Sequence, residues 1–377
     1  MSWKFKYYDV NTGPNWEAIE KNCEWFRDMK AIPQDAIWHA EGDVQIHTKM
    51  VCEALIKLPE FIELNEASKH IVFTSALMHD IEKRSTTMEE ERDGRICITA
   101  PRHAKRGEFT ARILLYKEYE CPFETREIIC KMVRWHGKPL YSLTDSGVER
   151  SIVSISMQLP IHWLAMLSKA DILGRICNDE AEQLEKIEYF KLYAADLECL
   201  YGPRKFTSEL SRFTYLSEGG YLNYEPFDET KFEVVMMSAL PGSGKDTYIG
   251  KHLDGYGIVS LDGIRVELKV KPTDKKANGT VIQIAKERAK EFMRKKQNFV
   301  WNATNITKDM RGQLIDLFRS YGGRVKIIYI EVPYKTLVSQ NRNREAMVPL
   351  VAIEKMITKL EPPLLDEAHV IINEINS

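Results

Sequence analysis

The sequence lacks the features of a membrane or secreted protein. None of its apolar runs reaches the length needed to span a bilayer, and residues 1–9 have neither the apolar core nor the cleavage site of a signal peptide. Its seven cysteines are scattered, odd in number and never spaced as C-x-x-C, which excludes a disulfide framework and a zinc ribbon. We therefore expect a cytoplasmic protein with reduced thiols and no membrane partner.

Internal repeats and low-complexity tracts are also missing. The 377 residues are 44% hydrophobic and 29% charged, which is the composition of a globular protein and excludes collagen-like and disordered chains. At roughly 100–200 residues per domain, the length predicts a multidomain chain with two or three domains. Each half of the chain is long enough to bury its own core.

The two halves of the chain differ in the spacing of their apolar residues. Up to about residue 216 these residues recur at helical spacing, as in the segments 44–58, 67–78, 103–116, 124–135, 161–173 and 180–200. A stretch rich in glycine and acidic residues follows at 217–228 and is typical of a domain boundary. We predict an all-α domain over residues 1–226.

Short apolar strand segments alternate with helical segments after this boundary. Strands are expected at 232–240, 257–261, 298–303, 324–332 and 369–373, and the helices between them include 245–253, 280–296 and 308–321. Such alternation predicts an α/β domain over residues 227–377, in which helices flank a parallel sheet on both faces.

The net charge of −2 conceals an uneven distribution. Residues 1–230 carry 29 basic and 38 acidic side chains, a net charge of −9, whereas residues 231–377 carry 24 and 17, a net charge of +7. The near-neutral total therefore excludes no class of partner, and the second half is basic enough to bind a polyanion.

A glycine-rich segment at 239–247 lies between the first predicted strand and a helix. Here glycines let backbone N–H groups surround an anion, the helix N-terminus adds positive potential, and a lysine reaches the β- and γ-phosphates. The segment predicts a site for ATP or another nucleoside triphosphate with Mg²⁺, formed by Gly242, Ser243, Gly244, Lys245, Asp246 and Thr247.

Asp246 departs from the usual pattern, since most such loops have Ser or Thr directly after the lysine. Two explanations are open. Either Asp246 helps to hold the metal, directly or through water, or Thr247 caps the loop and the metal is held mainly by phosphates and water.

An aspartate and an arginine follow the second predicted strand. Asp262 would lie in the crevice at the carboxyl ends of the parallel strands, where it can take a proton from an attacking hydroxyl. Arg265, one helical turn later, can bind a neighbouring phosphate.

These segments, together with residues 302–305 and 340–349, resemble the 5′-OH polynucleotide kinase family in order and spacing. The resemblance implies that Lys245 binds the phosphates of ATP and that Asp262 is the general base for the 5′-OH. It also implies that Arg265 holds the phosphate 3′ to that hydroxyl.

The same resemblance implies a helical lid. Arg342 and Arg344 would be its arginines and would neutralise the charge that builds on the transferring phosphoryl group. A basic helix end that complements the helix dipole is the alternative explanation for the two arginines. Asn302 is neutral where relatives often have an acid.

Histidines are concentrated in the first half of the chain, where seven of the nine precede residue 163. Imidazoles and carboxylates from several helices can converge in a bundle core and form a binuclear metal site. Two metals about 3.5–4 Å apart can activate water and cleave phosphate esters. The candidate ligands, in chain order, are His47, His79, Asp80, His103, His136 and Asp171.

This ordered series, with its adjacent His79 and Asp80, resembles the HD phosphohydrolase superfamily. Residues 39–48 and 170–175 are most similar to the HD domain appended to bacterial tRNA CCA-adding enzymes. That resemblance implies phosphatase and cyclic phosphodiesterase action on 2′ and 2′,3′ termini. It implies divalent transition metals, two in number, with His103 and His136 as ligands of the second.

Several neighbouring residues have no settled role in the sequence. His39 lies outside the ligand pattern, and a buried and a substrate-facing position are both open. Five basic residues have two possible explanations, contact with a substrate phosphate or a place on an exposed basic face. They are Lys83, Arg102, Lys105, Arg106 and Arg175.

An HD phosphohydrolase fused to a P-loop kinase resembles the bacterial HD-Pnk end-healing enzymes over essentially the whole chain. The resemblance implies ATP-dependent phosphorylation of 5′-OH ends of RNA or DNA and removal of 2′,3′-cyclic, 2′- or 3′-phosphates, with sealing left to a separate ligase. The alternatives are a metabolite or nucleoside kinase fused to an HD nucleotidase, and an inactive nucleic-acid-binding module.

Overall fold

The computed structural model describes residues 3–92, 94–141, 146–271, 273–344 and 347–376. They form two compact units, Met1–Lys205 and Phe206–Ser377. The sequence places the domain boundary later, at residue 226, because the stretch 217–228 has the composition of a linker. Helix α13 (Glu209–Glu218) packs with the second unit, where Arg212 donates to the carbonyl of His369 at 2.8 Å and the rings of Phe213 and His369 lie 4.4 Å apart.

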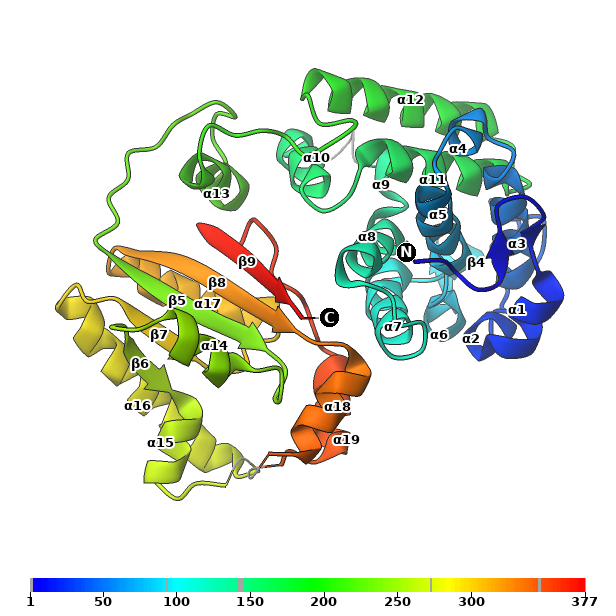
Figure 1. Ribbon diagram of the computed structural model, residues 1–377. Coiled ribbons are helices and arrows are strands. Elements are labelled where there is room, and N and C mark those ends of the chain that lie inside the picture. Colours follow the sequence, from blue (N-terminus) through cyan, green and yellow to red (C-terminus); the bar gives the residue numbers. More distant parts are fainter. Residues whose placement is uncertain (1–2, 93, 142–145, 272, 345–346, 377) are drawn as a thin grey trace. The chain divides into compact units, whose positions relative to one another are not determined.

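The first unit is mainly helical, as predicted (Figure 1). Its helices are α1 (Trp16–Asn22), α2 (Glu24–Arg27), α3 (Val44–Leu55), α4 (Pro59–Ile62), α5 (Glu66–Met78), α6 (Lys83–Thr86), α7 (His103–Lys117), α8 (Phe123–Trp135), α9 (Lys138–Tyr141), α10 (Val148–Ser156), α11 (Ile161–Leu173) and α12 (Glu180–Asp196).

Helix α11 lies at the centre of this unit. Apolar side chains occur around its whole circumference, and it packs against α3, α5, α8, α9 and α12. A helix that is apolar on all sides is stable only when neighbours surround it. These five helices therefore surround α11.

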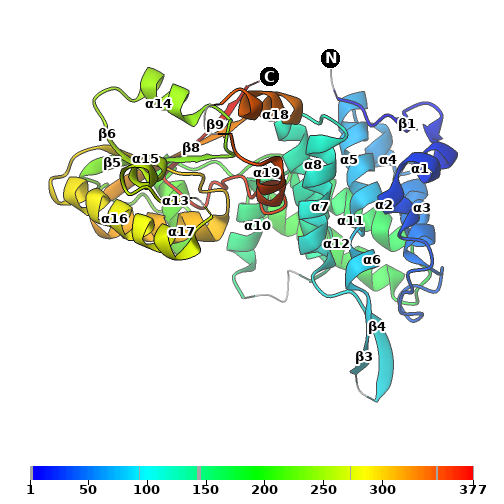
Figure 2. The same cartoon turned by 90° about the horizontal axis from the view of Figure 1, so that it is seen from below.

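The prediction of an all-α first domain is wrong in one respect, because the unit contains two small antiparallel pairs. One pairs β1 (Tyr8–Asp9) with β2 (Gly13–Pro14), and the other is a hairpin of β3 (Met88–Arg92) and β4 (Arg95–Thr99). The hairpin extends away from the helices in Figure 2. Its first strand carries acidic, largely solvent-facing side chains and lacks apolar alternation, so the available signal was the Asp-Gly dipeptide before β4.

The second unit contains the predicted parallel sheet. Its five strands are arranged in the order β6-β7-β5-β8-β9, and every neighbouring pair is parallel. The strands are β5 (Phe232–Ala239), β6 (Gly257–Ser260), β7 (Phe299–Asn302), β8 (Gly323–Glu331) and β9 (Val370–Ile375). The strand positions predicted from the sequence are confirmed to within two residues at their starts.

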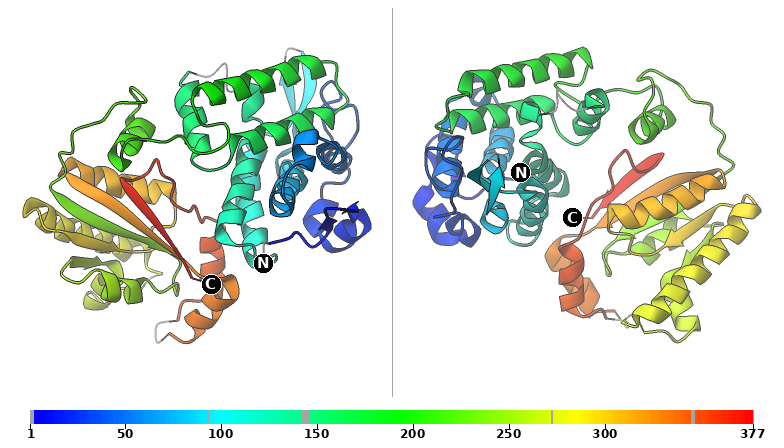
Figure 3. Two further views of the ribbon diagram at one scale, coloured as in Figure 1. Left: turned by 45° about the horizontal axis from the view of Figure 1, so that its top comes forward. Right: turned by 180° about the vertical axis from the view of Figure 1, so that it is seen from behind.

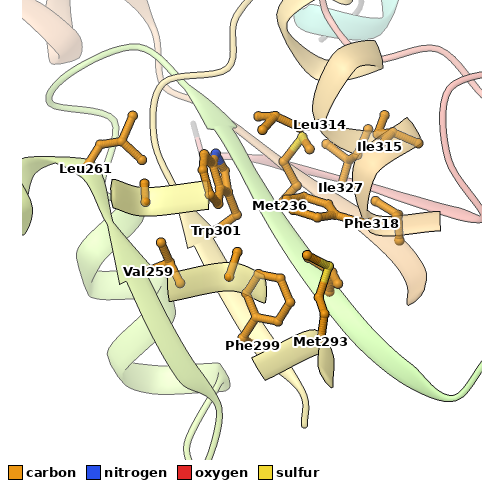
Figure 4. Close-up of a cluster of buried hydrophobic side chains, with 14 of the residues drawn as sticks. Met236, Val259, Leu261, Met293, Phe299, Trp301, Leu314, Ile315, Phe318 and Ile327 are labelled. Carbon is orange, nitrogen blue, oxygen red and sulfur yellow. The ribbon is translucent and has the colours of Figure 1, made fainter. Parts of the chain in front are cut away.

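Helices cover both faces of this sheet, as Figures 1 and 3 show. Besides α13, the helices of this unit are α14 (Lys245–His252), α15 (Leu261–Glu267), α16 (Lys275–Arg294), α17 (Lys308–Ser320), α18 (Tyr334–Arg342) and α19 (Leu350–Ile357). Helices α18 and α19 lie beyond the ends of the strands in Figure 1. Alternate residues of β5 point to opposite faces: Val234 and Met236 pack with α15–α17, whereas Val235 and Met237 pack with α14. Figure 4 shows Trp301, Phe299 and Phe318 in the core on the α17 side.

Within the described part of the chain, no single helix has both the length and the apolar character needed to cross a membrane. Helices α10 and α11 meet such a test only when taken together, and they are bent by 106° at the break between them.

Buried charges join α7 to α8. The guanidinium of Arg112 donates to Glu127 at 2.8–3.1 Å and to Glu108 at 2.8 Å, and Lys131 donates to Glu108 at 2.6 Å. Removing one member of such a network leaves its partners as uncompensated buried charges. The network holds together the two helices that carry His103 and His136.

We expect the substitution Arg112→Met to lower the free energy of unfolding of the first unit by about 3–5 kcal/mol. Urea unfolding followed by tryptophan fluorescence measures this, since six of the seven tryptophans precede residue 205. Lys191→Met, which removes a more exposed ion pair with Glu188, should change it by less than about 1 kcal/mol. Equal losses in the two variants would contradict a special role for the buried network.

Candidate active sites

The structure brings together all six residues predicted as metal ligands. They come from five helices or helix ends: His47 on α3, His79 and Asp80 at the end of α5, His103 at the start of α7, His136 at the end of α8 and Asp171 on α11. Five of the six side chains are almost completely buried, and that of His103 is the most exposed.

Asp80 lies between two pairs of imidazoles. Its Oδ2 is 3.2 Å from His79 Nε2 and 3.6 Å from His47 Nε2, while its Oδ1 is 3.3 Å from His103 Nε2 and 3.8 Å from His136 Nε2. One carboxylate therefore faces two separate groups of nitrogen ligands, which is the arrangement of a bridging ligand in a binuclear site.

In three of the four histidines the other ring nitrogen makes a hydrogen bond. His79, His103 and His136 each hold Nδ1 at 2.7–2.8 Å from the backbone carbonyl three residues earlier. Because a carbonyl oxygen only accepts, Nδ1 carries the proton in these residues and Nε2 is left to bind a metal. For His47, Nδ1 lies 2.8 Å from Oε1 of Glu41, a contact of ion-pair distance without hydrogen-bond geometry.

The distances between facing Nε2 atoms show that a metal fits here. Those of His47 and His79 are 3.3 Å apart, and those of His103 and His136 are 3.4 Å apart. Two imidazole lone pairs at this distance require a proton or a cation between them. Asp80 Oδ1 is also buried without a hydrogen-bond partner among the described residues. The donor set therefore fits two divalent cations.

The pKa values favour the forms that bind metals. Burial lowers the pKa of His136 to about 3 and also lowers that of His103, so both imidazoles are neutral at neutral pH. Burial would raise the pKa of Asp80, but His79 and Lys83 together hold it well below its usual value. Burial would lower the pKa of His79, but Asp80 and Asp171 raise it instead. Asp80 is thus ionised, with the neutral imidazoles of His103 and His136 on one side.

A cavity of about 400 Å³ opens onto this centre. Lys83, whose Nζ is 2.7 Å from Asp80 Oδ2, lines the cavity, and so does Arg175, which donates to both oxygens of Asp171 at 2.7 and 3.1 Å. These are two of the five basic residues with no settled role in the sequence. Arg102, Lys105 and Arg106 are not among the described residues that line the cavity.

Glu41 is a site residue that the sequence reasoning missed. Its carboxylate is fully buried and lies 2.8–2.9 Å from the Nδ1 atoms of both His47 and His39. His39 is mostly buried and also lines the cavity. It therefore combines the buried and the cavity-facing positions that the sequence left open. The available signal was Glu41 itself, six residues before the first ligand His47. This spacing matches no helical repeat, so the role of Glu41 could not be assigned without the fold.

Gly174, just after α11, allows α11 to lie close to α3, which carries His47. A Cβ at this position would lie 2.6–2.7 Å from atoms of Val51 on α3, including its backbone nitrogen and Cα. Only glycine allows this approach, which places Asp171 Oδ1 3.2 Å from His47 Nε2.

The predicted phosphate-binding loop connects β5 to α14. Gly242 and Gly244 have φ values of +91° and +96°, which only glycine adopts at little cost, and Gly244 is the N-cap of α14. Ser243 is buried, whereas Asp246 and Thr247 are exposed on the first turn of the helix. Backbone N–H groups and the helix dipole are therefore available to an anion.

Asn302 and Asp246 are directly linked. At the end of β7, Asn302 donates its amide to Oδ1 of Asp246 at 2.8 Å. The neutral residue at this strand end and the acid in the loop, the two departures from the expected pattern, thus compensate each other. An acid at both positions would place two carboxylates in contact.

Asp262 and Arg265 lie together on α15, directly after β6. Arg265 donates to Asp262 Oδ1 at 2.5 Å, and its Nε donates to Asn278 Oδ1 at 2.7 Å. Asp262 is 81% exposed, so a substrate hydroxyl can reach it. Asn278 on α16 orients the guanidinium and is a further residue that the sequence did not indicate.

The end of α18 lies against the phosphate-binding loop. A Cβ on Gly242 would be 3.5–3.6 Å from Asn341, and Asn341 exchanges hydrogen bonds with the backbone of Val348 at 2.8 and 3.1 Å. Arg342 is exposed and Arg344 is half-buried. Burial lowers the pKa of Lys245 to about 8, and the charge of Arg344 adds to this effect.

The substitution Gly174→Ala should weaken metal binding by about 10-fold or more, because it forces α11 away from α3 and separates Asp171 from His47. Titration of the metal-free chain with Mn²⁺ by calorimetry measures this. Gly202→Ala is the matched control, since nothing lies within 4 Å of a Cβ there. Unchanged Mn²⁺ affinity in Gly174→Ala would show that the close approach is not required.

ATP affinity should fall as the pH rises above about 8. In the free site Lys245 loses its proton with a pKa of about 8, and bound phosphates raise that pKa again, so binding above pH 8 takes up a proton. At about pH 9 the calorimetric heat of ATP binding should depend on the ionisation heat of the buffer. Lys245→Met should abolish that dependence, and a pH-independent wild-type affinity would contradict the assignment.

Comparison with known proteins gives a family match that lies within the second unit. Residues 234–363 match a protein family described as "AAA domain". A solved structure from Chloroflexus aurantiacus, described as a "putative kinase", is 13% identical, with a TM-score of 0.34, over 39% of this chain and 86% of the other. No curated protein matches. The family match, the glycine-rich loop and the parallel sheet together indicate a P-loop domain in the second unit.

Proposed function

We propose that this chain is a bifunctional nucleic-acid end-healing enzyme. Its P-loop unit transfers the γ-phosphate of ATP to 5′-OH ends of RNA or DNA, and its helical unit removes 2′,3′-cyclic, 2′- or 3′-phosphates. A break left by a metal-independent ribonuclease carries these two kinds of end. Joining the healed ends requires a separate ligase.

One observation carries the kinase assignment: an exposed carboxylate lies at the nucleotide-binding edge of the sheet, with a guanidinium against it. Asp262 follows β6 and Lys245 follows β5, so both lie at the carboxyl ends of parallel strands. An acceptor that brings a hydroxyl to Asp262 and a phosphate to Arg265 matches the 5′ end of a polynucleotide. The net charge of +7 over residues 231–377 favours the same polyanion.

In this proposal Asp262 takes the proton of the 5′-OH. The resulting oxygen attacks the γ-phosphorus of ATP, the bond to the β,γ-bridging oxygen breaks, and ADP leaves. Lys245, Arg342 and Arg344 stabilise the charge on the phosphates during transfer. Asp246, oriented by Asn302, would help to hold the Mg²⁺ that accompanies ATP.

In the helical unit, divalent metal ions bound by the six ligands would supply Lewis-acid activation of the phosphate ester and of water. Lys83 and Arg175 line the cavity and would bind the phosphate oxygens. Hydrolysis of a 2′,3′-cyclic phosphate adds water across one P–O bond and frees one hydroxyl. A second hydrolysis releases inorganic phosphate and leaves the 2′,3′-diol.

Substitutions should separate the two activities. Lys245→Ala and Asp262→Ala should lower 5′ phosphorylation by about 100-fold or more and leave phosphate release from 2′,3′-cyclic ends unchanged. His79→Ala and Asp80→Ala should do the reverse and should also lose metal, as measured by elemental analysis. A single substitution that abolished both activities in a folded chain would contradict two independent sites.

The choice of acceptor distinguishes a polynucleotide kinase from a metabolite kinase. Transfer of labelled γ-phosphate to a 5′-OH oligonucleotide should exceed transfer to free nucleosides, because Arg265 binds a phosphate that nucleosides lack. Preferred phosphorylation of a nucleoside would contradict the polynucleotide assignment.

A further inference from the structure

The cavity over the metal centre is much larger than a phosphate group requires. Its volume is about 400 Å³, within the range of cavities that hold small organic ligands. Part of its wall comes from the metal ligands and from Lys83 and Arg175. The rest comes from residues 33–39, from the end of β4, from α9 and the glycine before it, and from Thr87, Asp179 and Gln183. None of these residues is a predicted metal ligand, and of their side chains Gln34 contacts Lys83.

Two polar atoms in this second part of the wall have no partner. Gln34 Nε2 and Thr99 Oγ1 are buried and make no hydrogen bond within the described part of the chain. The other amide atom of Gln34 accepts from Lys83 Nζ at 2.8 Å, so the unpartnered atom is the N–H₂ donor. Buried polar groups are costly to leave unpaired, and a polar ligand in the cavity would satisfy both.

Two aromatic side chains on the same cavity are solvent-exposed. Trp38 is 48% exposed and Tyr141 is 63% exposed, and both line the cavity. Exposed indole and phenol rings beside cationic side chains are a suitable surface for a stacked nucleobase. The cavity therefore combines an aromatic surface, hydrogen-bonding atoms and cations.

Asp35 holds this wall in place before any ligand binds. Its Oδ1 accepts from the backbone of Ile37 and from Arg95, both at 3.1 Å, and its Oδ2 accepts from the backbone of Ile98 at 3.2 Å. One buried carboxylate thus ties the segment that contains Gln34 and Trp38 to the strand that ends at Thr99. A wall fixed in this way costs little entropy to order on binding.

We propose that the cavity is a subsite for the terminal ribonucleoside of the substrate. The base stacks on Trp38, Gln34 and Thr99 form hydrogen bonds with the polar atoms of the nucleoside, and Lys83 and Arg175 hold the phosphate. This inference rests on the proposed function of the helical unit and adds that the unit recognises the nucleoside as well as the phosphate. Phosphate esters without a nucleoside then gain nothing from this wall.

The test compares two substrates in the full-length chain loaded with Mn²⁺: adenosine 2′,3′-cyclic phosphate and glycerol 2-phosphate, which has neither a nucleoside nor an aromatic ring. Trp38→Ala should raise KM for the cyclic nucleotide by about 5-fold or more, since stacking on an aromatic side chain is worth at least about this factor. Its kcat/KM for glycerol 2-phosphate should stay within about twofold. Gln34→Leu should act in the same direction, and Trp38→Phe should retain most of the affinity.

Tyr189→Ala is the matched control, because Tyr189 is an exposed aromatic residue of α12 that does not line the cavity. Calorimetric binding of adenosine 2′,3′-cyclic phosphate to the metal-free chain provides a readout without turnover, and Trp38→Ala should weaken it by the same factor. Equal loss with both substrates would mean that Trp38 only supports the metal centre, and no loss with either would remove it from the site. Both results overturn the inference.

The proposed end-healing function can be tested separately from the nucleoside subsite. If the wild-type chain hydrolyses glycerol 2-phosphate but no 2′,3′-cyclic, 2′- or 3′-phosphate end, the end-healing assignment is wrong. Nucleotide binding that Trp38→Ala weakens would, even then, support the nucleoside subsite. Absence of nucleotide binding to the wild-type chain would overturn the subsite as well.

Discussion

The helical unit depends on one constraint: a buried, ionised aspartate must be surrounded by ligands whose orientation is fixed from outside. Asp80 meets four imidazoles, and the far nitrogen of each lies against an oxygen. Backbone carbonyls of α5, of α8 and of the segment before α7 accept hydrogen bonds from three of them, and the carboxylate of Glu41 lies 2.8 Å from the fourth. The five helices that carry the ligands are therefore held at one point, and Gly174 and the Arg112 network keep them there.

In the P-loop unit, the functional side chains come from distant parts of the chain, and the charged carboxylates among them stay exposed. Its parallel strands all end at one edge of the sheet, so Lys245, Asp262 and Asn302 lie on neighbouring connections. Asp262 stays exposed and paired with Arg265, and Asn302 binds Asp246 through a neutral amide. Lys245, by contrast, is desolvated and has a lowered pKa, a state that favours an incoming polyanion.

Much of the fold was predictable because apolar periodicity records which faces are buried. The helices of the first unit and the strands of the second follow directly from it. The hairpin β3–β4 was not predicted because its first strand carries charged and solvent-facing residues. The unit boundary differed because α13 contacts residues that lie far away in the sequence, such as His369. Long-range contacts of this kind leave no local pattern.

For the sites, the sequence by itself determined the chemical types and their order: the glycine-rich loop, the Asp262 and Arg265 pair, and the histidine and aspartate series. The tertiary structure alone decided which atoms meet. It placed Asp80 between two imidazole pairs, brought Glu41 against His47 and joined Asn302 to Asp246. It also left Gln34 Nε2 and Thr99 Oγ1 without a hydrogen-bond partner among the described residues, on the cavity that Trp38 lines. The reason is physical: residue type and spacing specify which chemistry is available, whereas hydrogen-bond partners and burial depend on packing between segments that are distant in the chain.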